Sequence, residues 1–222
     1  MKRHDFYRFL INFIYPNICP CCGEIIGYND AFCGGCAETL EPCTVNTKIK
    51  FADDFAAFCI YKDNAAQAVQ HFKDEPCGNT AYAFAYCIFR AITEKGFAEC
   101  VDEIAFIPMT REDHNRRGYN QTELIAHELH FMMNIPYRNA LVKLRKTRRQ
   151  KELSGEERKQ NIAGAFAAAQ GLRFDGKNVL IIDDVCTTGS TLSDAARALR
   201  EAGAERVFAA AFAKTQILPR NS

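Results

Sequence analysis

The sequence has almost no excess of charge of either sign. Its 222 residues include 28 lysines and arginines against 27 aspartates and glutamates, which leaves a formal net charge of +1. The molecule as a whole therefore does not attract nucleic acid or an acidic membrane surface, and any basic function has to be local. No apolar run is long enough to span a bilayer. The N-terminal run at residues 9–15 is short and interrupted by Asn12, so we expect a packed amphipathic helix there and no signal peptide.

Two common nucleotide-binding motifs are also missing. The sequence contains neither the Gly-x4-Gly-Lys-Ser/Thr pattern of P-loop proteins nor the Gly-x-Gly-x-x-Gly pattern of dinucleotide-binding folds. Both of these classes are therefore disfavoured.

Cysteine, in contrast, is plentiful, with eleven residues along the chain. An odd number scattered through expected helices and strands argues against a secreted disulfide framework. It favours a reducing compartment in which the thiols bind metal or are buried. We therefore expect a cytoplasmic protein.

Four of these cysteines form two Cys-x-x-Cys pairs near the N-terminus and predict a metal site. The four residues are Cys19, Cys22, Cys33 and Cys36. Four thiolates at this spacing can surround a zinc ion tetrahedrally, and a site closed by four protein ligands is structural rather than catalytic. Zinc would also replace the core that a module of this size lacks. Cys21 and Cys43 lie close by, and either could take the place of one of the four.

Residues 179–191, VLIIDDVCTTGST, are the most informative stretch of the chain. Four apolar residues, two carboxylates and a run of small hydroxyl residues predict a buried strand that ends in a tight polar loop. A helical pattern follows at residues 192–202, so backbone N–H groups and the positive end of a helix dipole surround one small volume, which suits a phosphate. Asp183 and Asp184, at the carboxyl end of the strand, can hold two neighbouring ribose hydroxyls. Together these features indicate a site for a ribose 5-phosphate.

Alternating strand and helix patterns predict an α/β domain with a parallel sheet over residues 51–222, after an N-terminal helix and zinc-binding module at residues 1–50. Further strands are expected at residues 55–61, 101–108 and 205–213, and further helices at 65–72, 82–92 and 122–133. The single cysteines Cys59, Cys77, Cys87 and Cys100 are expected to be buried or incidental thiols. Lys73, at the end of a predicted helix, either favours the negative end of that helix or faces a ligand phosphate.

Two basic segments have more than one interpretation. Residues 110–121 are expected to form a loop after a strand, in which Arg116 and Arg117 either bind pyrophosphate or are solvated. Residues 141–160 carry the densest positive charge and are expected to form an exposed, mobile loop leading into a helix. This stretch is a solvated charge run, a loop that closes over the ligand, or a track for a nucleic-acid backbone. The candidate nucleic-acid residues are Lys143, Arg145, Lys146, Arg148 and Arg149.

Residues 181–191, IIDDVCTTGST, resemble the signature loop of type I phosphoribosyltransferases, which bind 5-phosphoribosyl 1-pyrophosphate (PRPP). The resemblance implies that Asp183 and Asp184 hold the ribose hydroxyls, and that the 5-phosphate is wrapped by Thr187, Thr188, Gly189, Ser190 and Thr191. Cys186 stands where an aliphatic residue is usual. If the chain is an enzyme, Asp183 and Asp184 would act together with Mg²⁺ and with Arg116 and Arg117, which would stabilise the departing pyrophosphate.

The order of the parts resembles the ComF family of competence-associated proteins. It runs from the four-cysteine module through Arg117-Gly118-Tyr119-Asn120-Gln121 and the basic stretch to Gly164-Ala165-Phe166 and the signature loop. The resemblance implies a PRPP-binding protein that assists the uptake or handling of single-stranded transforming DNA, with a competence helicase or other DNA-uptake proteins as partners. The alternative is an active salvage phosphoribosyltransferase, which would transfer ribose 5-phosphate from PRPP to a base and release pyrophosphate.

Overall fold

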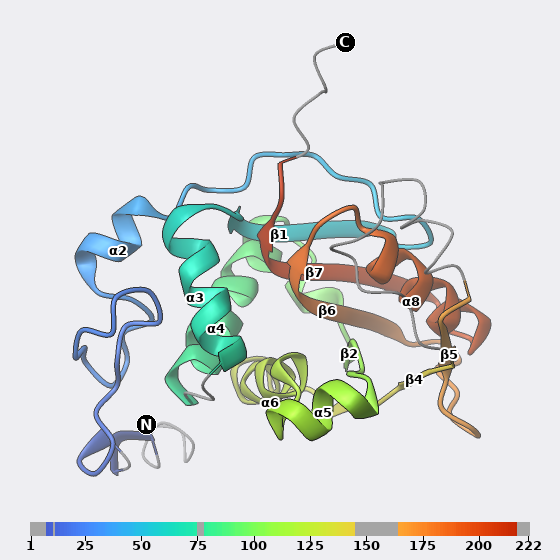
Figure 1. Cartoon of the computed structure of the whole chain (residues 1–222). Coiled ribbons are helices and arrows are strands. Elements are labelled where there is room, and N and C mark those ends of the chain that lie inside the picture. Colours follow the sequence, from blue (N-terminus) through green and yellow to red (C-terminus); the bar gives the residue numbers. More distant parts are fainter. Residues whose placement is uncertain (1–7, 11, 75–77, 145–163, 217–222) are drawn as a thin grey trace.

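A five-stranded parallel sheet forms the centre of the computed structural model, which describes residues 8–10, 12–74, 78–144 and 164–216 (Figure 1). The strands, in their order across the sheet, are β1 (Asp54–Ile60), β7 (Arg206–Lys214), β6 (Asn178–Cys186), β2 (Glu103–Phe106) and β3 (Tyr137–Arg138). A separate antiparallel pair consists of β4 (Leu141–Lys143) and β5 (Phe166–Ala168). The parallel α/β sheet expected from the sequence is confirmed.

The middle strands are apolar on both faces, which is why they lie inside the fold. In β7, Phe208 and Phe212 belong to the hydrophobic cluster on one face of the sheet, whereas Val207 and Ala209 belong to the cluster on the other. Residues 179–182 of β6 alternate between the two clusters in the same way. Strands of this kind are stable only when helices cover both faces of the sheet.

Helices do cover both faces (Figure 1). One face packs against α3 (Asp63–Asp74), α4 (Gly78–Glu94) and α6 (Gln121–Met133). The other packs against α8 (Ser190–Glu201) together with β4 and β5. The short helices are α2 (Gly34–Thr39), α5 (Arg111–Arg117) and the 3-10 helix η1 (Ala98–Cys100). Among the helices that the structure describes, none is both long and apolar enough to cross a membrane.

The cysteine-rich N-terminal region packs against the same core as α3 and α4. Phe32 lies next to Phe212 of β7, with ring centroids 6.2 Å apart and planes inclined by 17°. Pro42 forms an isolated antiparallel bridge with Cys59 of β1. The region is therefore tied to the sheet by both apolar and backbone contacts.

Two expectations about local structure were wrong. Residues 110–121 do not form a loop throughout, because Arg111–Arg117 is the helix α5. Its first turn is capped by Thr110, whose hydroxyl accepts a hydrogen bond from the Asp113 N–H at 3.1 Å, and Gly118 ends the helix with a φ of +79°. The cap residues could have identified this helix.

The second correction concerns the start of the basic stretch. Residues 141–143 form the strand β4 and not an exposed mobile loop, and Leu141 is buried. Its partner β5 begins 25 positions after Leu141, at Phe166, and a pattern of local charge does not reveal such a pairing. Residues 145–163 lie outside the part of the chain that the structure describes.

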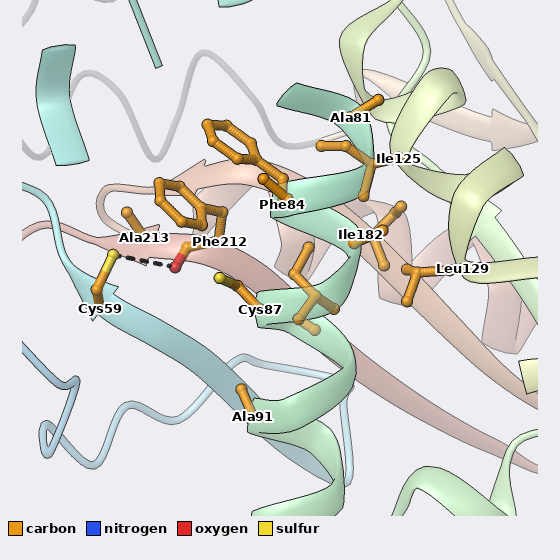
Figure 2. Close-up of a cluster of buried hydrophobic side chains, with 14 of the residues drawn as sticks. Cys59, Ala81, Phe84, Cys87, Ala91, Ile125, Leu129, Ile182, Phe212 and Ala213 are labelled. Carbon is orange, nitrogen blue, oxygen red and sulfur yellow. Dashed lines mark hydrogen bonds between the residues drawn. The ribbon is translucent and has the colours of Figure 1, made fainter. Parts of the chain in front are cut away.

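Figure 2 shows how the strand β7 is anchored in the core. The Phe212 ring stacks on Phe84 of α4 with centroids 3.8 Å apart, and the Cys59 thiol donates a hydrogen bond to the Phe212 carbonyl at 3.5 Å. Cys59 and Cys87 are buried, as expected from the sequence. Cys100 is half-buried, and Cys77 lies outside the described residues.

We expect Phe212→Ala to lower the free energy of unfolding by about 3–5 kcal/mol, because the fully buried ring leaves a cavity among other rings. Urea unfolding measures the effect. The control is Phe13→Ala, which removes a ring that is 75% exposed and is expected to change stability by no more than about 0.5 kcal/mol. Similar losses in the two variants would contradict this account of the core.

Candidate functional site

A pocket of about 320 Å³ lies at the carboxyl end of β6, and we call it the acidic pocket. Asp183 and Asp184 line it, near the end of the strand, and the loop between β6 and α8 forms a second wall. Tyr61, Ile107 and Phe166 add apolar surface from three other segments. Such a position, at the carboxyl edge of a parallel sheet, is where open α/β folds bind ligands.

The two carboxylates of the acidic pocket differ in charge. Lys73, at the end of α3, contacts Asp184 with 2.7 Å between its Nζ and the Oδ2. Burial alone would raise the pKa of Asp184, but Lys73 and hydrogen bonds to the carboxylate hold it below its usual value. Burial, followed by repulsion from Asp184, raises the pKa of Asp183 well above its usual range. The pair therefore combines one firmly ionised carboxylate with one that retains a proton easily.

The sequence left two interpretations of Lys73 open, and the structure places its side chain against Asp184. It also lines the acidic pocket. Burial alone would lower the pKa of Lys73, but Asp184 and Asp183 raise it, so the ammonium stays charged. A lysine in this position can neutralise the carboxylates and also attract an anionic ligand.

Gly189 shapes the loop between β6 and α8. Its φ of +78° is left-handed, and a Cβ at this position would lie 2.6 Å from Cδ1 of Ile49. Both the conformation and the close approach favour glycine. Ile49 belongs to the segment that links the N-terminal region to β1, so this segment holds the loop from outside.

The loop residues face two different pockets. Thr187, Gly189 and Thr191 line the acidic pocket, whereas Thr188 and Ser190 line a neighbouring pocket on the other side of the loop. The Thr188 and Ser190 hydroxyls are hydrogen-bonded to each other at 2.8 Å. The resemblance assigned all five residues to one phosphate, whereas in the structure three of them line the acidic pocket and two line its neighbour.

Lys214 is a site residue that the sequence reasoning missed. It ends β7, is only 3% exposed, and donates hydrogen bonds to the carbonyls of Thr187 at 2.7 Å and Thr215 at 2.6 Å. The ammonium thereby fixes the first residue of the loop. The sequence did contain a signal, namely a lysine directly after the apolar run 207–213. A cation that is buried at the end of such a strand needs hydrogen-bond partners, so it is expected to hold a neighbouring segment in place.

Of the remaining candidate residues, one lines the acidic pocket, two lie elsewhere, and four are outside the described part of the chain. Lys143, on β4, lines the acidic pocket, and burial lowers the pKa of its ammonium group. Arg116 pairs with Asp113 at 2.8 Å, and Arg117 donates to Gln121 at 3.3 Å. Neither arginine lines the acidic pocket. The other four candidate nucleic-acid residues lie outside the described residues, and they are Arg145, Lys146, Arg148 and Arg149.

The structure brings four thiols together in the N-terminal region. The sulfur atoms of the cluster lie within 4.8 Å of one another, and the cluster consists of Cys19, Cys22, Cys33 and Cys36. The Cys22 and Cys33 sulfurs are 3.7 Å apart, close to the separation of about 3.8 Å between two sulfurs in a tetrahedron with Zn–S distances near 2.3 Å. The cluster can therefore hold a metal ion. Cys21 is fully buried, and neither it nor Cys43 belongs to the cluster.

Comparisons with known proteins match part of the chain to a domain family and most of it to named relatives. A family model for the phosphoribosyl transferase domain matches residues 116–219. Competence protein F of Haemophilus influenzae is 29% identical over 194 residues, which cover 85% of this chain and 81% of that protein. DNA utilization protein YhgH of Escherichia coli K12 is 27% identical over 194 residues, with coverages of 86% and 81%. The structure of purine phosphoribosyltransferase from Pyrococcus horikoshii is 19% identical, with a TM-score of 0.38 and coverages of 61% and 79%.

We expect Asp183→Asn to stabilise the protein at pH 8 by about 1 kcal/mol or more. The folded state raises the pKa of Asp183 above 3.8, so stability is lost as the pH rises from that value through the folded pKa. Asparagine removes this loss, and its Oδ1 can still accept the hydrogen bond from the Asp184 N–H. Urea unfolding at pH 8 and pH 5 should therefore show a gain that shrinks at the lower pH.

Asp184→Asn is the matched control and should have the opposite sign. It removes the carboxylate that pairs with Lys73, so we expect a loss of about 1–3 kcal/mol at pH 8. Two variants that shift stability in the same direction, or a gain in Asp183→Asn that does not depend on pH, would contradict the unequal charges of the pair.

For the thiol cluster, Cys36→Ser should lower the metal content after dialysis from about one ion per chain to well below half, because a hydroxyl is a weak ligand for a soft metal site. Mass spectrometry of the metal measures it. Cys100→Ser removes a half-buried thiol outside the cluster and should leave the content unchanged. Equal metal content in both variants would argue against the cluster.

Proposed function

We propose that the chain is a member of the ComF family of competence-associated proteins, that it binds PRPP, and that it assists the handling of single-stranded DNA in natural competence. The relatives named competence protein F and DNA utilization protein YhgH support the DNA role. The observation that supports PRPP binding most directly is that Asp183 and Asp184 line the same pocket as the loop between β6 and α8.

Each part of PRPP has a complementary part in the acidic pocket. Asp183 and Asp184 accept hydrogen bonds from the two ribose hydroxyls. The 5-phosphate lies at the 187–191 loop, where backbone N–H groups and the N-terminus of α8 favour an anion. Lys73 and Lys143 line the same pocket and neutralise the pyrophosphate. A volume of about 320 Å³ is at the small end of the range for ligand pockets.

Two metal ions fit this proposal. Mg²⁺ prefers carboxylate and phosphate oxygens, so Asp183 and Asp184 suit a magnesium complex of PRPP, in which the ion would offset the charge of the pyrophosphate. Zinc fits the four-cysteine cluster, because four thiols within 4.8 Å leave no open position. The described cysteines form no disulfide, and thiols stay reduced in the cytosol, so we place the protein in the cytoplasm.

We assign DNA binding to the basic stretch that begins at Lys143 and continues with Arg145, Lys146, Arg148 and Arg149. Lysines and arginines in series bind the phosphate backbone without reading its sequence, which suits transforming DNA of any origin. Because Lys143 lies in the acidic pocket, this stretch starts at the PRPP site. A competence helicase or another DNA-uptake protein is the partner that we expect.

One observation favours the second candidate, an active phosphoribosyltransferase of nucleotide salvage. A further pocket of about 560 Å³ is lined by Pro108, Met109, Asn139 and neighbouring residues, and Lys143 lines both it and the acidic pocket. A base bound there would lie beside the ribose of PRPP. Consumption of PRPP and release of pyrophosphate with one particular base would establish this activity.

Calorimetric titration of the metal-loaded protein with PRPP and Mg²⁺ tests the proposal. We expect saturable binding by the wild type, and a loss of at least about tenfold in affinity in Asp184→Asn, because a hydrogen bond to a charged group contributes about 1.5–3 kcal/mol.

Asp175→Asn serves as the matched control. It makes the same change at an exposed carboxylate that is paired with Arg173 and does not line the acidic pocket. Its affinity should equal that of the wild type. A folded wild type that does not bind PRPP, or equal losses in both variants, would refute the ribose-phosphate site.

A further inference from the structure

A second pocket of about 690 Å³ lies on the other side of the loop between β6 and α8, and we call it the lysine pocket. Three of its residues come from the segment just before β1, and three come from the loop and the first turn of α8. They are Lys48, Lys50 and Phe51 on one wall and Thr188, Ser190 and Ser193 on the other. The lysine pocket and the acidic pocket therefore share one loop as their common wall.

The segment with the two lysines is firmly attached to that loop. Ile49 is only 5% exposed and lies against Gly189, and the Lys50 N–H donates a hydrogen bond to the Ser193 hydroxyl at 3.1 Å. The neighbouring side chains of Lys48 and Phe51 remain exposed. A fixed backbone with exposed long side chains on both sides of a buried anchor is suited to binding a ligand without rearrangement.

Phe51 has an unusual backbone for a bulky residue. Its φ is +68°, in the left-handed region, and its side chain is 43% exposed. Large side chains rarely adopt this conformation, and such outliers occur disproportionately at functional sites. The Lys50 ammonium lies 4.9 Å from the centre of the ring. The ammonium lies over one face of this partly exposed ring, so a base that stacked on the ring would bring its phosphate close to a cation.

The charge of the lysine pocket is positive. Among the described residues, neither Lys48 nor Lys50 forms an ion pair. The one carboxylate of the pocket, Asp194, already accepts hydrogen bonds from the N–H groups of Gly164 at 2.8 Å and Phe166 at 2.9 Å, and from Arg197 at 3.0 Å. The lysines are therefore available for an anion, and the Ser190 and Ser193 hydroxyls offer additional polar groups.

We propose that the lysine pocket binds a nucleotide unit of single-stranded DNA, with its base stacked on Phe51 and its phosphate held by Lys48 and Lys50. The choice of DNA as the source of the nucleotide rests on the proposed function. Stacking on an aromatic ring tolerates any base, as the handling of DNA of any origin requires. Because Thr188 and Ser190 face this pocket while Thr187 and Gly189 face the acidic pocket, DNA and PRPP contact opposite sides of one loop.

Fluorescence anisotropy with a labelled thymidine oligomer tests the proposal, with thermal unfolding of every variant to confirm the fold. We expect Phe51→Ala to weaken binding roughly tenfold, since stacking on an aromatic ring contributes about 1–3 kcal/mol per base. Phe51→Tyr keeps an aromatic face and should retain the affinity. The double variant Lys48→Glu, Lys50→Glu should lower both the affinity and the dependence of binding on salt.

Lys95→Glu is the control for charge reversal, because Lys95 is exposed and does not line the lysine pocket; it should bind as the wild type does. Unchanged binding in the Phe51 and double-lysine variants, with binding lost in Arg148→Glu, Arg149→Glu, would overturn the inference and leave the proposed function intact. Thymidine monophosphate binding as tightly as the oligomer would overturn DNA as the source. A wild type that binds PRPP but no DNA would refute both this inference and the DNA role.

Discussion

The site depends on two adjacent carboxylates, Asp183 and Asp184, that line one pocket with a lysine paired to the second of them. Asp183 and Asp184 cannot both carry full charge there at low cost, and Lys73 settles which of them does. The result is a pocket that contains two carboxyl groups and whose overall charge is nevertheless close to zero, because lysines also line it. Such a site can hold ribose hydroxyls and still admit phosphate groups. Without a lysine partner, the two carboxylates would repel those phosphates.

The sheet and its helices place the charges of this pocket. The central strand β6 brings the carboxylates to the carboxyl edge of the sheet, α3 supplies Lys73, and β7 ends in Lys214, which fixes Thr187. Because β7 is anchored by the stacked rings of Phe84 and Phe212, the geometry of the loop depends on the core. The N-terminal region contributes through Phe32 in the core and through Ile49 at the loop. The N-terminal region, the sheet and the loop after β6 are therefore joined by direct contacts.

Much of the fold could be predicted from the sequence, because its strands and helices are long and strongly patterned. The loop after β6 was recognisable because the residues of its sequence pattern, 187–191, are consecutive. The contacts that tune the site were not: Lys73 is 111 positions from Asp184, and Ile49 is 140 positions from Gly189. Such pairs are joined only by the tertiary structure. The division of the loop between two pockets, with Thr188 on one side and Thr187 on the other, also depends on backbone geometry that residue types alone do not determine.

The central claim is that the loop and the acidic pair form a ribose 5-phosphate site, and nuclear magnetic resonance of the ¹⁵N-labelled protein tests it most directly. Ribose 5-phosphate carries the phosphate and the two hydroxyls without the pyrophosphate, so it isolates this part of the site. The account predicts saturable shifts of the backbone amide signals of residues 187–191 and of Asp183 and Asp184, with signals at the thiol cluster unchanged. Shifts confined to other parts of the molecule, or none at saturating ligand, would contradict it.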